Sequence, residues 1–316
     1  MMRIRPLVLA LAALLVAAVA LAAKPAPAAK KSPRESLVVT TSWLAAHLAD
    51  PDLVLLHVGD KAEYDAKHIA GARRVSLGDI SVTDHAGRGL ILEMPPVEDL
   101  RARLAGLGIS DKSRVVVYYG KDWVSPSTRV IFTLDYAGLG DRAVLLDGGM
   151  GAWVRDGHPV TAEVPAPRTG TLAPLKIHAT IVDAAYVRAH LTAPGTHVID
   201  GRASVFYDGV DTGESHEGMM HKTGHLPGAG SFPFTEVTDD NLMLRSPAEL
   251  AALLAKAGAK PGDTILGYCH IGQQATAMLF AARTLGYKVL LYDGSMDDWS
   301  RVASNPVVNP VATAGK

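Results

Sequence analysis

Residues 264–282 read TILGYCHIGQQATAMLFAA, and this stretch decides the fold. A short apolar run at 264–268 precedes Cys269, and an apolar run of helical character begins at Ala275. The stretch therefore predicts a buried strand, a short loop and a helix in direct succession. A cysteine in that loop lies at the carboxyl end of a strand, which is the edge where open α/β sheets bind ligands.

Cys269 is the only cysteine of the chain, so no intramolecular disulfide and no Cys-rich metal or iron–sulfur site can form. Successive N–H groups of the loop can form an anion-binding nest, strengthened by the positive end of the following helix. The same field favours the thiolate of Cys269 over the thiol. Gly272 relieves steric strain in a loop this tight. The alternative is an inert cysteine buried at a strand end, but strand, loop and helix together favour a reactive thiol.

The rest of the chain is a tandem duplication. The matched landmarks, in the same order in both halves, are HIAGA at 68–72 with HLPGA at 225–229, and Asp147 and Trp153 with Asp293 and Trp299. Each half is more than 100 residues long, which is too long for a solenoid repeat and suits a domain.

Short apolar runs alternate with helical patterns in both halves. The predicted strands are 53–58, 114–119 and 143–146 in the first half, and 198–200, 264–268 and 288–292 in the second. Continuous apolar runs are typical of parallel strands that are covered on both faces. The clearest helix is Pro247 to Ala257, because Ser246 can cap it and Glu249 completes a capping box. The fold class is therefore α/β, with a central parallel sheet flanked by helices in each half.

Length and composition exclude several classes of protein. A chain of 316 residues suggests about two domains. Hydrophobic residues make up 48% and charged residues 20%, which excludes a disordered protein. A formal net charge of -1 gives no electrostatic footprint for nucleic acid, so we expect no nucleic-acid partner.

The first residues have the pattern of an export signal. Arg3 and Arg5 precede an apolar run that ends with A-x-A spacing at 20–22. This predicts a signal peptide at 1–22 and a flexible leader, rich in Ala, Pro and Lys, at 23–36. We expect an exported protein, periplasmic or otherwise extracytoplasmic, with no membrane attachment after cleavage. The alternative is an uncleaved anchor, since the run almost reaches spanning length.

Export to an oxidising compartment raises the question of why the chain carries a single thiol. A lone cysteine in an oxidising compartment has no internal partner, so it is either buried and inert or kept for its reactivity.

The tandem layout, the two His-x-x-Gly-Ala segments and the loop at 269–275 together resemble the two-domain rhodanese-type sulfurtransferases, the thiosulfate/3-mercaptopyruvate sulfurtransferase family. The resemblance covers nearly all of the chain after the leader. It implies two tandem rhodanese-like domains: a non-catalytic one at 37–160 and a catalytic one at 177–304, with a Pro- and Gly-containing linker at 161–176 and an irregular tail at 305–316.

Tyr119 takes the position of the cysteine in the first half when the strand at 115–119 is aligned with the one before Cys269. From that position to the landmark tryptophan the first half has 34 residues and the second has 30. We therefore expect the first half to have a longer loop and no nucleophile.

The resemblance also implies the chemistry. Cys269 is the catalytic residue, and the substrate-binding residues are Arg202, His270, Ile271, Gly272, Gln273 and Gln274. The Cys269 thiolate takes the outer sulfur of a small anionic donor such as thiosulfate, and sulfite departs. The persulfide then passes its sulfur to cyanide, a small thiol or a protein thiol. No metal or organic cofactor is required.

Arg202 follows the predicted strand that ends at Asp200, and a parallel sheet brings that strand end near the Cys269 loop. The resemblance implies that its guanidinium faces the anionic donor, and fork geometry suits an oxyanion. The alternative is a structural ion pair, with Asp200 as the partner.

Other functions remain to be weighed. Cysteine phosphatases with a related loop need an arginine at the sixth position after the cysteine, where this chain has Ala275, and this counts strongly against them. A persulfide carrier that does not turn over small anions needs the same loop and stays open.

The favoured donor is a separate question. Thiosulfate users tend to carry basic residues after the cysteine, and 3-mercaptopyruvate users small polar ones. His270 and Ile271 match neither pattern, although a protonated His270 can supply part of the charge. We expect thiosulfate, because an exported enzyme meets inorganic sulfur anions more readily than a cytosolic keto acid.

The histidines outside the loop have plainer interpretations. His225 has a twin in His68, and we expect a scaffold role for both, as for Asp293 and Trp299. His216, His221 and His225 lie in a glycine-rich insertion of the second half. Their spacing fits no metal motif, so a solvated loop is expected there and no metal.

Overall fold

The computed structural model describes residues 31–84, 89–121, 123–212 and 221–314. The predicted signal peptide at 1–22 and most of the leader lie outside the described residues. Within these ranges, none of the helices combines the length and the hydrophobicity needed to cross a lipid bilayer.

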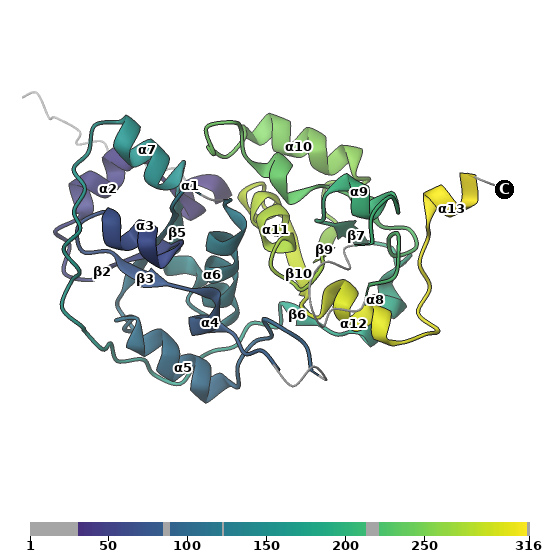
Figure 1. The fold of residues 1–316 in the computed structure, drawn as a ribbon, viewed down its shortest axis with the longest axis horizontal. Coiled ribbons are helices and arrows are strands. Elements are labelled where there is room, and N and C mark those ends of the chain that lie inside the picture. Colours follow the sequence, from purple (N-terminus) through teal and green to yellow (C-terminus); the bar gives the residue numbers. More distant parts are fainter. Residues whose placement is uncertain (1–30, 85–88, 122, 213–220, 315–316) are drawn as a thin grey trace, which may run out of the picture. The chain divides into compact units, whose positions relative to one another are not determined.

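Each half is built around a five-stranded sheet in which every pairing is parallel (Figure 1). The first sheet has the order β1-β5-β4-β2-β3 and the second β6-β10-β9-β7-β8. The two orders are the same when the strands of each half are counted from its start. This confirms the predicted α/β fold and the duplication.

The elements of the first half are β1 (Val38–Val39), β2 (Leu53–Val58), β3 (Arg73–Val75), β4 (Arg114–Tyr119) and β5 (Ala143–Leu146), with α1 (Pro33–Leu37), α2 (Thr41–His47), α3 (Lys61–Ala66), α4 (Leu77–Ile80), α5 (Val97–Gly106), α6 (Ser125–Tyr136), η1 (Gly140–Arg142) and α7 (Gly149–Arg155). Those of the second half are β6 (Ile181–Val182), β7 (Thr196–Asp200), β8 (Gly230–Ser231), β9 (Thr264–Tyr268) and β10 (Lys288–Tyr292), with α8 (Ala184–His190), α9 (Ser204–Tyr207), η2 (Phe234–Val237), α10 (Pro247–Lys256), α11 (Ala275–Thr284), α12 (Ser295–Arg301) and α13 (Pro310–Ala314).

The central strands are apolar throughout because both of their faces are buried. In β9, Ile265 belongs to the large cluster that also contains α11, whereas Leu266 and Tyr268 belong to the cluster on the opposite face. Cys269 continues this alternation and belongs to the same cluster as Ile265. The period of two in side-chain direction thus sends the thiol toward α11.

The capping box predicted for α10 is present. Ser246 Oγ accepts from the Glu249 N–H at 3.3 Å, and the Glu249 carboxylate accepts from the Ser246 N–H at 2.9 Å. These two bonds satisfy N–H groups that have no partner within the helix. The helix therefore begins where the sequence predicts.

Equivalent tyrosines fix the alignment of the two halves. Tyr118 Oη accepts from the Ile69 N–H at 3.1 Å, and Tyr268 Oη accepts from the Leu226 N–H at 3.0 Å. Tyr119 therefore occupies the position of Cys269, as predicted.

The extra length of the first half is divided between two places. Gly138 and Gly286, which end α6 and α11 with φ of 79° and 87°, mark equivalent points after these helices. The segment from Tyr119 to Gly138 is two residues longer than the segment from Cys269 to Gly286. The other two of the four extra residues follow α6, in the region of η1. The expected longer loop was wrong, because α6 begins as far from Tyr119 as α11 does from Cys269.

The two halves share one apolar core. The largest cluster includes Val117 and Leu134 of the first half together with Met278 and Leu279 of the second. Across this boundary α6 packs on α11, and Thr128 Oγ1 lies 2.9 Å from Thr276 Oγ1.

The boundary between the halves is approximately symmetric. Asp147 accepts a hydrogen bond from the Leu244 N–H at 2.8 Å, and its twin Asp293 accepts one from the Met94 N–H at 3.2 Å. Each aspartate therefore ties the end of its own sheet to a backbone segment of the opposite half.

The leader and the tail are more structured than predicted. Residues 33–36, assigned to the flexible leader, lie in α1, whose N-terminus has a Ser32–Glu35 capping box. Arg34 then bonds the carbonyl oxygens of Leu244 and Arg245, which holds the helix in place. In the tail, Val308 pairs with His225 and α13 follows, so an irregular tail was also a wrong expectation. The predicted linker at 161–176 contains no helix or strand, and its first residue bridges to His68.

Candidate active site

Cys269 lies directly after β9 and is buried, with 0% of its surface exposed. Its N–H donates to Ser295 Oγ at 3.0 Å, and its carbonyl accepts from the Met296 N–H at 3.1 Å. The Ser295 hydroxyl in turn donates to the Tyr292 carbonyl at 2.8 Å. The start of α12 thus fixes the cysteine backbone. Burial alone would fit an inert core thiol, so the loop that follows decides between the two interpretations.

Five of the six carbonyl groups at 269–274 accept hydrogen bonds from the protein. Those of Cys269 and His270 accept from the N–H groups of Met296 and Asp297, and that of Gly272 accepts from Arg129. The carbonyls of Gln273 and Gln274 accept from the N–H groups of Thr276 and Ala277.

The N–H groups of the same loop are not used in this way. In the part of the chain that the structure describes, those of Ile271, Gly272, Gln273, Gln274 and Ala275 donate to no other residue. Five consecutive N–H groups at the start of a helix are suited to bind an anion, because they carry partial positive charge and have no acceptor among the described residues. This is the arrangement that a persulfide or a bound sulfur oxyanion needs.

Gly272 is required at its position for two reasons. Its φ of +78° lies in the left-handed region, as predicted for a strained loop position. A Cβ there would also lie 2.5 Å from the Asp293 carbonyl oxygen and 3.1 Å from Arg129 Nη1. The loop can therefore pass this close to its neighbours only with glycine.

Arg202 forms the structural ion pair that was the alternative in the sequence analysis. Its Nη2 lies 2.6 Å from Asp200 Oδ2, its Nε bonds both carboxylate oxygens, and Nη2 also bonds the Gly224 carbonyl at 2.7 Å. Burial lowers the pKa of Arg202, but the Asp200 charge and hydrogen bond outweigh this, and the net shift is upward. Direct contact between Arg202 and a donor stays a prediction.

The strand end that carries Arg202 does lie beside the loop. The Gly201 N–H donates to the Tyr268 carbonyl at 2.8 Å, and a Cβ on Gly201 would lie 2.9 Å from Ala275 Cα. The predicted proximity of the ends of β7 and β9 is confirmed.

The remaining loop side chains have different surroundings. His270 is almost buried, packs edge-on to Phe206 at 4.6 Å, and its Nδ1 lies 3.4 Å from His221 Nδ1. The Gln273 amide donates to Ser125 Oγ of the first half at 3.3 Å. Gln274 Oε1 is buried and has no partner within the described residues. Ile271 is half-buried.

Sequence reasoning missed the residues that hold the loop from outside. Ser295 and Met296 belong to α12, and Ser125 and Arg129 belong to α6 of the other half. One signal was available: Arg129 interrupts the apolar side of a helix that continues as VIF at 130–132. A charged residue in such a run calls for a partner, but the sequence does not say which.

The first half has lost the site. His57 pairs in register with Tyr118 as Asp200 does with Tyr268, so His57 replaces the aspartate and Gly59 replaces Arg202. The two ring nitrogens of His57 are buried and have no hydrogen-bond partner in the described ranges, and burial lowers the pKa of His57 to about 4.

A carboxylate also occupies the corresponding loop. The Lys121 N–H, which matches that of Ile271, donates to Glu63 Oε1 at 2.8 Å. The first half therefore lacks the nucleophile and the arginine, and its own carboxylate takes up a loop N–H.

The histidines of the insertion do not form a metal site in the described residues. No group of three or more His, Cys, Asp or Glu side chains there is arranged to hold a metal ion. His216 lies outside the described residues. His225 stacks on Tyr207 and its Nδ1 lies 2.8 Å from that residue's carbonyl, as His68 does with Tyr64 at 2.7 Å. The scaffold role expected for these two twins is confirmed.

Both halves match the rhodanese-like domain family, over residues 40–156 and 183–302. The chain belongs to this family, as a tandem member with one cysteine-bearing site.

The relatives cover almost the whole described chain. A thiosulfate sulfurtransferase of Pseudomonas aeruginosa is 32% identical over 275 residues, which span 86% of this chain and 96% of that protein. A protein of the same organism named as a probable 3-mercaptopyruvate sulfurtransferase is 29% identical, over 85% of this chain and 97% of its own length. Among solved structures, an anaerobic ergothioneine biosynthesis enzyme from Chlorobium limicola has a TM-score of 0.75 at 20% identity, covering 89% of this chain and 72% of that one. That last similarity concerns the fold alone.

Proposed function

We propose that this chain moves sulfane sulfur from thiosulfate to a thiophilic acceptor through a persulfide on Cys269. The observation that carries the proposal is the loop of five N–H groups that have no acceptor among the described residues, next to the only thiol of the chain. Membership of a family whose similar members are named sulfurtransferases supports the reaction class.

The first half-reaction breaks the sulfur–sulfur bond of the donor. The Cys269 thiolate attacks the outer sulfur, a new sulfur–sulfur bond forms, and sulfite leaves with the electron pair of the broken bond. The loop N–H groups stabilise the negative charge of the bound donor and then that of the terminal persulfide sulfur, while the charge that the thiolate gives up leaves with sulfite. The Arg202–Asp200 ion pair lies at the end of β7, beside this loop.

The second half-reaction restores the thiolate. Cyanide or an acceptor thiolate attacks the terminal sulfur and departs as thiocyanate or as a persulfide. The bond to Sγ breaks, and its electron pair stays on Cys269. Such a cycle gives ping-pong kinetics.

Steady-state release of sulfite from thiosulfate, with cyanide as acceptor, tests the proposal. We expect turnover by the native chain and none by a folded Cys269→Ser variant. Sulfur loading without turnover would instead assign a persulfide carrier, and no loading at all would contradict the proposal.

The choice of donor needs its own comparison, because the relatives named for thiosulfate and for 3-mercaptopyruvate are similar to this chain to nearly the same degree. We propose thiosulfate, on the ground that an exported enzyme meets inorganic sulfur anions. Parallel measurements of kcat/KM with both donors decide this. A higher value with 3-mercaptopyruvate would reverse the assignment.

We also propose that the chain is exported and freed from its signal peptide, on the pattern of residues 1–22. N-terminal sequencing of the protein recovered from the producing cells tests this. A mature chain beginning at Ala23 supports cleavage, and an intact Met1 in the membrane fraction would favour an anchor.

A further inference from the structure

Arg129 of α6 is buried, with 1% of its surface exposed, and it reaches across the boundary between the halves. Its Nη1 donates to the Gly272 carbonyl at 3.0 Å, inside the Cys269 loop. Both of its terminal nitrogens also bond the Asp293 carboxylate, and Nη2 bonds the Leu92 carbonyl. One guanidinium thus joins α6, the end of β10, a segment of the first half and the Cys269 loop.

We propose that Arg129 is a positioning residue: it fixes the peptide between Gly272 and Gln273 so that the Gln273 N–H faces the anion site. This inference rests on the proposed role of Cys269. It assigns to the non-catalytic half a direct part in shaping the catalytic loop.

The peptide geometry gives the reason. The Gly272 carbonyl and the Gln273 N–H belong to one planar trans peptide, so they point in opposite directions. Gly272 has no side chain and glycine adopts both signs of φ readily, so this peptide is the least restrained one in the loop. A hydrogen bond that holds the carbonyl on the Arg129 side holds the N–H on the other side.

Neighbouring contacts between the halves do not supply this restraint. Ser125 Oγ accepts from the side chain of Gln273, and Thr128 Oγ1 contacts the side chain of Thr276. Neither of them touches the Gly272–Gln273 peptide. Among the described residues, Arg129 is the one that bonds the Gly272 carbonyl.

Arg129 has no counterpart of its own kind in the second half, although the two halves are approximately symmetric. Thr128 and Thr276 are twins, as are Gly138 and Gly286 at the helix ends, so the twin of Arg129 is Ala277. Arg129 of the non-catalytic half therefore contacts the Cys269 loop. The equivalent position in the second half is Ala277, whose short side chain cannot make the reverse contact.

The energetics also favour a functional role. Burying an arginine costs desolvation free energy, and replacing a buried ion pair with apolar side chains is often neutral or stabilising. Arg129 Nε, moreover, is buried with no partner among the described residues. Fold stability alone therefore does not explain well why a buried arginine is present at position 129.

Arg129→Met and Arg283→Met are a matched pair of variants. Arg283 of α11 also pairs across the boundary, with Asp135 at 3.0 Å, but it lies at the far end of the same two helices and touches no loop residue. We expect Arg129→Met to lower kcat/KM for thiosulfate by at least ~10-fold, because one stabilising N–H is no longer held in place. The pH midpoint for alkylation of Cys269 should rise, since the thiolate loses the same donor. Arg283→Met should change neither quantity.

Arg129→Met leaves the Asp293 carboxylate buried without its cationic partner, so we expect the variant to lose stability. The double variant Arg129→Met/Asp293→Asn removes both charges and keeps an acceptor for the Met94 N–H. We expect the double variant to fold and still to show the low kcat/KM and the raised alkylation midpoint. Native values of both in the folded double variant would overturn the inference. Failure of the proposed function would show differently, as absent Cys269-dependent transfer in the native chain.

Discussion

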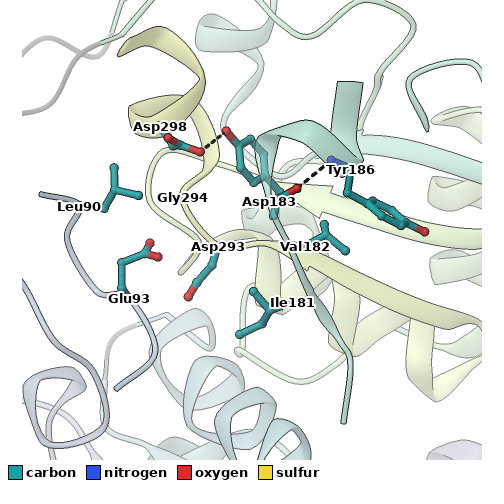
Figure 2. A pocket seen from close by; sticks show the side chains of 10 residues that line it. Leu90, Glu93, Ile181, Val182, Asp183, Tyr186, Asp293, Gly294 and Asp298 are labelled. Atoms are coloured by element: carbon teal, nitrogen blue, oxygen red, sulfur yellow. Dashed lines mark hydrogen bonds between the residues drawn. The ribbon is translucent and has the colours of Figure 1, made fainter. Parts of the chain in front are cut away.

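Glu93 is a half-buried acidic residue whose pKa lies far above its ordinary value. It lines a cavity of about 540 Å³ at the boundary between the halves, together with Asp293 and Asp298 (Figure 2). Burial and, to a smaller extent, the nearby Asp293 charge raise the pKa of Glu93 to about 8, against the opposing effect of Arg129. Its Oε1 is buried without a partner among the described residues. The carboxyl group is therefore held protonated at neutral pH.

This pKa predicts a pH-dependent stability. Between pH 4.5, the ordinary pKa of the group, and about 8, the folded chain keeps the proton that the unfolded chain has released. The free energy of unfolding therefore falls as pH rises through this window, and the loss is complete above pH 8. Glu93→Gln, which keeps the neutral shape, should be more stable than the native chain at pH 9 by about 1–3 kcal/mol, with little difference at pH 4.

Urea unfolding at the two pH values measures this difference. Glu98→Gln, on the exposed surface of α5 with 68% of its side chain accessible, is the control and should show no such gain. An equal effect of both variants would refute the assigned protonation of Glu93.

Single residues show where sequence reasoning stops. Cys269 and Gly272 could be predicted because their roles follow from neighbours in the same loop. The ion pair between Arg202 and Asp200 could be named as an alternative because the two residues are only two positions apart in the sequence. Arg129 could not be assigned, since its partners Gly272 and Asp293 lie 143 and 164 residues away. Contacts of that kind depend on how the halves pack.

At the scale of elements, the Cys269 loop depends on a close approach as much as on a backbone angle. Gly272 and Gly262 both have positive φ, 78° and 91°. A Cβ on Gly272 would collide with Asp293, whereas nothing lies within 4 Å of the Cβ position on Gly262. The two glycines therefore separate the two effects.

Gly272→Ala should abolish most of the sulfurtransferase activity, because the loop must shift to admit the methyl group. Gly262→Ala carries only the left-handed strain, of order 1–3 kcal/mol, and should keep its activity. Sulfite release and thermal unfolding of both variants test this. Full activity of Gly272→Ala would show that the loop tolerates the displacement.

The central strands and α10 could be predicted because they are long enough to show a hydrophobic pattern and carry capping residues. The edge strands β1, β6 and β8 have two residues each and β3 has three, which is too short for any pattern. The helix α1 was assigned to the leader on its composition, although Ser32 and Glu35 form a capping box, and Arg34 then bonds it to the second half.

At the scale of the whole molecule, the two halves are sequence duplicates that fold around one core. The face of α11 opposite its own sheet is buried against α6. Without the first half, that apolar face and the N-terminal end of α11 would be exposed to water.

We therefore expect the chain to unfold in one cooperative transition, with equal calorimetric and van't Hoff enthalpies. A separately produced fragment of residues 177–304 should fail to fold stably and should not transfer sulfur. Two resolved calorimetric transitions, or an active fragment, would show that the halves are independent.

The central claim is that Cys269 carries the transferred sulfur. Because the chain has one cysteine, the intact mass of the protein reports on this residue directly. After exposure to thiosulfate we predict a mass gain of one sulfur atom, located on the Cys269 peptide, removed by cyanide and absent in Cys269→Ser. An unchanged mass in the native chain, or an equal gain in Cys269→Ser, would contradict the account.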